Sequence, residues 1–102
     1  MAKFGVEILT SAWNELNEIA TYYLQLIGPS SAKKITDKIL DALQRLEEFP
    51  LSCAYVPDEE LKSAGYRMLI CDNYVCIYKL IDDVVYVYHI ANGKTDYSKL
   101  LK

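Results

Sequence analysis

The chain lacks the features that mark membrane, secreted and zinc-binding proteins. No apolar run approaches the roughly 20 residues that a membrane helix needs, and residues 1–6 contain no signal-peptide hydrophobic region. The three cysteines make an odd count without a CxxC pair, so the sequence indicates neither a disulfide framework nor a zinc site. We therefore expect a cytoplasmic protein with reduced cysteines and no membrane segment.

Catalytic signatures and excess positive charge are also missing. The sequence contains no phosphate-binding loop, metal-ligand cluster or Ser-His-Asp spacing, and we predict no cofactor and no metal. The net charge of −3 argues against indiscriminate binding to nucleic acid, which depends on clustered Lys and Arg. The charge is uneven, because residues 1–60 carry five basic and ten acidic residues, whereas residues 61–102 carry six basic and four acidic ones. The second part is therefore the one expected to meet an anionic partner.

What is present is the composition of one ordinary globular domain. The 102 residues are 52% hydrophobic and 25% charged, which suffices for a modest core without metal or disulfide support. We predict a single domain over residues 1–102. Residues 4–9 alternate as a first strand should, with Phe4, Val6 and Ile8 on one face.

Two amphipathic helices are expected next. Thr10 or Ser11 offers an N-cap for the first helix, which should end at Gly28-Pro29. Ser30 or Ser31 should cap the second helix, which Pro50 stops. The stripe of the first helix comprises Ala12, Leu16, Ile19, Tyr23 and Leu26, broadened by Trp13, Ala20 and Ile27. The stripe of the second comprises Ala32, Ile35, Ile39, Ala42, Leu43, Leu46 and Phe49. So short a connection makes the helices antiparallel neighbours, and their combined stripe needs a sheet beneath it.

The last third predicts a three-stranded antiparallel meander. Residues 66–71, 74–80 and 84–91 form its strands, joined by turns at Asp72-Asn73 and Asp82-Asp83. In the first hairpin Cys71 faces Tyr74 and Cys76 faces Leu69, so these two thiols are not opposite each other. Residues 50–64 show no sustained period and predict a surface loop with a helical turn near residues 58–61. The predicted fold is α+β, with the helical hairpin on one face of a four-stranded sheet in which strand 84–91 is central and strand 4–9 lies beside it.

Four residues of this part are candidates for chemistry. Arg67 could grip a phosphate with its planar guanidinium, or pair with an acidic residue on an exposed strand. Lys94 could supply a point charge to the same anion, or be a solvated lysine. His89 could act as an acid or base near neutral pH, or be a satisfied, partly buried side chain. Tyr97 could stack on a base or transfer a proton, or pin the tail to the sheet.

The order of elements and the C-terminal residues together resemble the RelE/ParE superfamily of toxins from type II toxin–antitoxin systems. The pattern is similar to the signature of its plasmid-stabilisation branch, and Leu9-Thr10-Ser11-Ala12 is similar to the start of that family's first helix. The matching residues are Tyr66-Arg67, Asn73-Tyr74, Tyr78, residues 87–90, Gly93-Lys94-Thr95-Asp96-Tyr97 and Leu100-Leu101.

This resemblance implies a toxin that a cognate antitoxin neutralises in a hetero-oligomer. RelE-like members cleave mRNA on the ribosome as metal-independent endoribonucleases, and we expect this mRNA interferase activity here, with Arg67, His89, Lys94 and Tyr97 as catalytic residues. ParE-like members instead bind and block DNA gyrase without enzymatic activity, which is the alternative. The sequence departs from RelE where Leu69, Cys76 and Thr95 stand in regions that carry additional basic residues in RelE. Fewer charges leave less electrostatic stabilisation for RNA cleavage.

Overall fold

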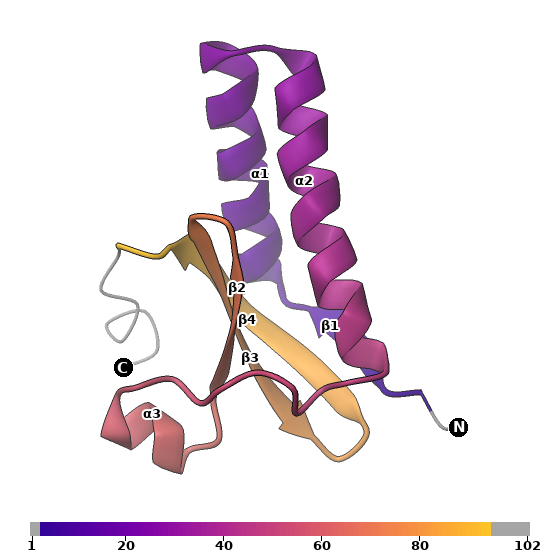
Figure 1. Ribbon diagram of the computed structural model, residues 1–102, viewed down its shortest axis with the longest axis vertical. Helices are drawn as coiled ribbons and strands as arrows, with labels where there is room; N and C mark the ends of the chain where they lie inside the picture. Colours follow the sequence, from indigo (N-terminus) through magenta and orange to yellow (C-terminus); the bar gives the residue numbers. More distant parts are fainter. Residues whose placement is uncertain (1–2, 95–102) are drawn as a thin grey trace.

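The computed structural model describes residues 3–94, which form a helical hairpin on one face of a four-stranded sheet (Figure 1). The sheet order is β1-β4-β3-β2, with β1 parallel to β4 and the other pairs antiparallel. The predicted α+β fold, the central place of β4 and β1 beside it are therefore confirmed. The elements are β1 (Gly5–Ile8), α1 (Thr10–Leu26), α2 (Pro29–Gln44), the 3-10 turn η1 (Arg45–Glu47), α3 (Glu59–Ser63), β2 (Arg67–Cys71), β3 (Tyr74–Ile81) and β4 (Val84–Asn92).

Apolar side chains are buried on both faces of the sheet. The larger core lies between the sheet and the hairpin, where Leu16, Ile39 and Leu43 pack with Tyr78 and Val87. The smaller core lies on the other face and comprises Val56, Leu61, Val75 and Ile77, with Tyr66 and Met68 packed against it. The segment between α2 and β2, predicted to be a surface loop, therefore contributes two buried side chains, because α3 and the residues before it cover this second face.

The predicted hairpin turns and cysteine positions are confirmed. Asp72 and Asp82 adopt positive φ angles of 54° and 55°, which places left-handed residues at both tight turns. Cys71 pairs with Tyr74 and Cys76 pairs with Leu69, and all three cysteines of the chain are free thiols. Among residues 3–94, no helix has the length and apolarity required to span a bilayer.

The predicted N-caps of both helices are wrong, whereas the predicted end of the first helix at Gly28-Pro29 is confirmed, with Gly28 at a φ of 145°. The N-cap of α1 is Leu9, whose side chain has no hydrogen-bonding group. The Ser11 hydroxyl does not cap the helix and donates to the backbone oxygen of Tyr88 at 2.7 Å. Pro29 is the first residue of α2 and Gly28 is its N-cap, so neither Ser30 nor Ser31 has that role. Proline suits this first position because its missing N–H would have no partner there in any case.

Part of each predicted apolar stripe is exposed, which corrects the helix faces. Leu26 and Ile27 are 64% and 69% exposed, because the tip of the hairpin extends beyond the sheet (Figure 1). Trp13 is also exposed, on a side of α1 that the core does not reach. Phe49 is 61% exposed, because α2 gives way at Arg45 to a 3-10 turn whose tighter winding rotates the following residues out of the stripe.

Candidate functional site

Arg67 is bound by the loop that precedes it along the chain. Its Nη1 donates to the backbone oxygen of Cys53 at 2.6 Å and to that of Leu51 at 3.5 Å. The guanidinium carbon lies 4.0 Å from the centre of the Tyr55 ring, within the range of a cation–π interaction. Among residues 3–94, the observed partners of Arg67 are backbone carbonyls and an aromatic ring, and not the acidic side chain that was one of the two predictions.

A second side chain fastens the same loop. Tyr78 is fully buried and lies directly opposite Arg67 in the β2–β3 pairing. Its hydroxyl donates to the backbone oxygen of Pro50 at 2.7 Å. Burial raises the pKa of Tyr78 above its usual value, and a hydrogen bond with Cys53 acts in the same direction. The phenol therefore stays protonated at neutral pH and serves as a permanent donor to the loop.

The loop also continues the sheet past β2. Tyr55 forms an antiparallel bridge with Arg67, the Val56 N–H donates to Tyr66 and the Met68 N–H donates to Ala54. These bonds pair the loop with the start of β2, which would otherwise present free backbone groups at the edge of the sheet. Further along, β2 has no other strand partner among residues 3–94, and Ile70 is 65% exposed.

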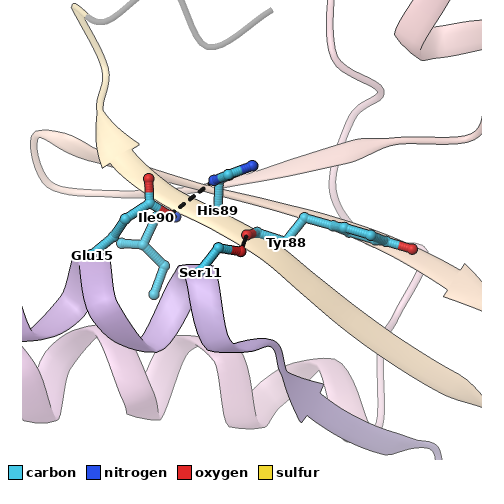
Figure 2. A network of polar contacts seen from close by, with 5 residues as sticks. All are labelled: Ser11, Glu15, Tyr88, His89 and Ile90. Carbon is cyan, nitrogen blue, oxygen red and sulfur yellow. Dashed lines mark hydrogen bonds and ion pairs between the residues drawn. The ribbon is translucent and has the colours of Figure 1, made fainter. Parts of the chain in front are cut away.

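His89 lies on β4, two strands away from Arg67 on β2, and contacts α1. Its Nδ1 donates to Glu15 Oε1 at 3.0 Å, because a carboxylate only accepts, and the same oxygen accepts the Ile90 N–H at 3.1 Å (Figure 2). Both side chains are largely buried, with 16% of His89 and 23% of Glu15 exposed. Ser11 bonds the neighbouring Tyr88 carbonyl from the same helix.

This network replaces a missing stretch of strand. β1 ends at Ile8, which pairs with Val87, so among the described residues no strand pairs with the rest of β4 on that side. The side chains of Ser11 and Glu15, four apart on one face of α1, bond the unpaired backbone of β4 instead. A β-bulge lies at the same place, because Ile77 pairs with His89 while Tyr78 pairs with Val87.

Lys94 lies at the far end of the sheet from Arg67. It borders a groove of about 460 Å³ on the second face, lined also by Met68, Ile70, Asn73 and Val75. The Gly93 N–H bonds the Asn73 carbonyl at 2.7 Å, which places the end of β4 beside the β2–β3 turn. Asn73 follows Arg67 by six residues, or about 20 Å of extended chain.

The four predicted site residues therefore do not form one cluster within the part of the chain that the structure describes. Arg67 and Lys94 lie at opposite ends of the β2–β3 hairpin, so the expectation that both hold one anion does not fit this geometry. Arg67 and His89 lie on β2 and β4, with β3 between them. Tyr97 falls outside the described residues.

The buried cysteines and tyrosines, Cys71, Cys76 and Tyr74, offer no ready nucleophile. Burial raises the pKa of Cys76 to about 12, and burial also raises that of Cys71. Burial, followed by a hydrogen bond with Tyr23, raises the pKa of Tyr74 to about 12. These groups are protonated and neutral near pH 7, so they function as packing groups and donors.

Two functional partners escaped the sequence reasoning. The first is Glu15, whose only sequence signal is its position four residues after Ser11 on the helix that follows β1. The second is the set of backbone carbonyls at residues 50–53. Every residue has such a carbonyl, so the side chains of this segment do not indicate the contact.

Comparison with solved structures shows that this fold is shared with known toxins. The structure of the chromosomal ParDE toxin–antitoxin system from Pseudomonas aeruginosa matches with a TM-score of 0.75 at 21% identity, covering 88% of this chain and 96% of that one. A mutant of the Escherichia coli toxin RelE in its free state matches with a TM-score of 0.68 at 13% identity, covering 97% and 95%. The RelBE2 toxin–antitoxin complex from Mycobacterium tuberculosis gives 0.66 at 15%, covering 89% and 99%. At these identities the likeness concerns the fold alone.

The family assignment comes from the sequence match. No curated protein matches the chain. The model of the ParE toxin of the type II toxin–antitoxin system parDE matches residues 6–97, from β1 through the tail. Because this match covers most of the chain, the protein belongs to the ParE toxin family of type II toxin–antitoxin systems.

Proposed function

We propose that this toxin arrests growth by binding DNA gyrase, without cutting RNA, and that a cognate antitoxin neutralises it. The match to the ParE family supports this choice, because the resemblance to ParE-like toxins implies gyrase as the target. The likeness to proteins of the ParDE system and of the RelBE2 complex supports an antitoxin partner.

The state of Arg67 carries the argument against RNA cleavage. A nuclease must place cations where negative charge develops on the phosphorane, so the cation has to be available to the substrate. Here the guanidinium bonds two loop carbonyls and stacks on Tyr55. Turning it toward a phosphate would leave a carbonyl without its donor, which costs about 1–3 kcal/mol. Lys94 lies at the other end of the hairpin, so it does not supply a second cation beside Arg67.

A supercoiling assay tests the proposal. Purified toxin at micromolar concentration is added to gyrase and relaxed plasmid, and the loss of supercoiled product is measured. We expect inhibition, and we expect transcripts from cells expressing the toxin to show no new ends at ribosomal A sites. Unaffected supercoiling together with codon-phased cuts would overturn the proposal in favour of ribosome-dependent mRNA cleavage.

RNA cleavage remains the second candidate, and the Glu15–His89 pair is the observation that favours it. A carboxylate on Nδ1 selects the tautomer in which Nε2 is the free acceptor, and this arrangement suits a general base. In Figure 2 the second ring nitrogen lies on the side away from Glu15. Under this candidate, His89→Gln should abolish A-site cuts while leaving antitoxin binding intact. Retention of the cuts in that variant would remove His89 from the mechanism.

A further inference from the structure

The loop between α2 and α3 exposes large apolar side chains. Phe49 and Leu51 are 61% and 58% exposed, and Tyr55 is 42% exposed. These three side chains lie within seven residues of one loop, and exposed apolar side chains of this size are typical of protein interaction surfaces. We name these side chains, together with the acidic residues at positions 47–60, the loop surface.

The loop surface is held in place before any partner arrives. Arg67 and Tyr78 bond the backbone at Cys53 and Pro50, and the Val56 N–H bonds Tyr66. Because these bonds fix the backbone between the exposed side chains, binding does not have to order the loop. A preorganised set of aromatic and aliphatic anchors is what a binding hot spot requires.

The charge of the loop surface is negative. Residues 47–60 include five acidic residues and no Lys or Arg, whereas the net charge of the whole chain is only −3. The turn with Asp82 and Asp83 lies at the same end of the molecule, because the N–H groups of Phe4 and Gly5 bond the carbonyls of Glu47 and Asp83. In Figure 1, α3 and the β3–β4 turn lie on two sides of the end of the molecule opposite the hairpin tip, and the loop runs between them.

Basic side chains near this end balance only part of that charge. Lys3 and Arg45 line one shallow hollow together with Glu47, Glu48 and Asp41, on the α2 side of the loop. Lys62 lies on α3, Arg67 stacks on Tyr55 within the loop surface, and Lys79 lies over the Tyr66 ring. The seven acidic residues at positions 47, 48, 58–60, 82 and 83 outnumber these five basic ones, so this end of the molecule keeps a net negative charge. A partner with the opposite charge would gain in association rate and specificity.

A second group of exposed apolar side chains lies at the hairpin tip. There Ile27 borders a hollow of about 200 Å³ together with Lys34, Lys38 and Asp72, and Lys38 forms an ion pair with Asp72 at 2.8 Å. Lys34 leaves this hollow with a net positive charge, which favours an acidic partner. Because the two groups are similar in apolar exposure but differ in the charge around them, the tip provides a matched control for the loop surface.

We infer that the loop surface is where this toxin contacts gyrase, by docking on a basic surface that the enzyme uses to hold DNA. This inference rests on the proposed function and adds the surface and the chemistry of the contact. An enzyme that grips DNA neutralises phosphates with clustered Lys and Arg, so it presents a basic surface by necessity. Acidic side chains around rigid apolar anchors complement such a surface in charge, while the anchors supply the buried contact.

A comparison of two double variants tests the inference. Phe49→Ser with Leu51→Ser alters the loop surface, and Leu26→Ser with Ile27→Ser alters the tip by the same chemistry. All four positions are exposed, so both proteins should unfold at the wild-type temperature. We expect the loop variant to need at least about tenfold more protein to inhibit supercoiling, and the tip variant to match wild type.

Two further measurements address the nature of the contact. Binding of wild-type toxin to immobilised gyrase should weaken between about 50 and 200 mM salt, and excess duplex DNA should displace it. Equal inhibition by the loop variant and wild type would overturn the inference while leaving the proposed function intact, and so would equal loss in both variants or binding that DNA does not affect. If wild-type toxin leaves supercoiling unchanged, the proposed function itself fails and the inference fails with it.

Discussion

Arg67 and Tyr78 face each other across β2 and β3, and each donates a hydrogen bond to a backbone carbonyl of the same loop. The strand pairing positions both donors, and the loop carbonyls accept from both. The residue that the sequence predicts as a catalytic cation is therefore also a structural link between the sheet and the loop surface.

Replacing these two residues should reveal that link as a loss of stability. Arg67→Ala should lower the free energy of unfolding by about 1–3 kcal/mol, and Tyr78→Phe by about 1–2 kcal/mol, because each leaves a loop carbonyl without its donor. In a double-mutant cycle followed by urea unfolding, the two losses should couple by at least about 0.5 kcal/mol. Lys62→Ala, on exposed α3, is the control and should change little. Wild-type stability in Arg67→Ala would mean that the bonds to the loop contribute nothing.

Removing the carboxylate of Glu15 should loosen β4. Glu15→Ala takes away the acceptor of the Ile90 N–H and the partner of His89, so we expect a loss of about 1–3 kcal/mol and faster exchange of the Ile90 amide hydrogen. Glu15→Gln keeps an acceptor oxygen and should lose less. Glu18→Ala, on the exposed surface of the same helix, serves as the control. Unchanged exchange at Ile90 in Glu15→Ala would show that water replaces the carboxylate at no cost.

Stability should fall at alkaline pH. Burial raises the pKa of Cys76 from 9.0 to about 12 and that of Tyr74 from 10.0 to about 12. Because the folded state holds these protons more tightly than the unfolded chain, the stability is fully present below about pH 9 and is lost as the pH rises from there toward about 12. Urea unfolding at a series of pH values measures the decline. Tyr74→Phe should make it shallower between about pH 10 and 12, and an identical slope in this variant would exclude a contribution from Tyr74.

The three thiols should differ in reactivity toward a thiol reagent. Cys71 and Cys76 are buried, whereas Cys53 is partly exposed. Under native conditions at mildly alkaline pH, about 8 to 9, we expect Cys53 to react first. Cys71 and Cys76 should react only at the rate of unfolding. Mass spectrometry after partial labelling should find the label on Cys53. Early labelling of Cys76 would indicate that the core opens locally at β3.

The local sequence pattern predicted the helices and strands well, but it predicted the contacts at the ends of the helices poorly. The spacing of apolar residues located both helices, and alternation with turn residues located the meander and its register. The same reasoning assigned Ser11 to a helix cap, although its hydroxyl bonds the Tyr88 carbonyl 77 residues away along the chain. It placed Ile27 and Phe49 in the core, although Ile27 lies at the tip of the hairpin and Phe49 follows a 3-10 turn that rotates it out of the stripe. Periodicity describes a helix face but carries no information about how much of that face a partner covers.

For the candidate site, the residue types were predictable and their partners were not. Arg67, His89 and Lys94 stood out because few side chains of this chain carry such chemistry. Whether they act together depends on distances across the sheet, and the register places Arg67 and Lys94 at opposite ends of one hairpin. The carbonyls that engage Arg67 belong to a loop without periodicity, so no pattern in that segment announces the contact.

The sequence by itself determined the α+β fold, because apolar periodicity and turn residues are local properties that act within a few positions of the chain. The match of residues 6–97 to the family model determined the family. The tertiary structure decided which groups are available to a partner. It committed the Arg67 guanidinium to the loop and the Glu15 carboxylate to His89 and β4, and it left Phe49 and Leu51 exposed beside acidic residues. These outcomes depend on contacts between segments 14 to 75 residues apart, and such contacts exist only once the sheet has assembled.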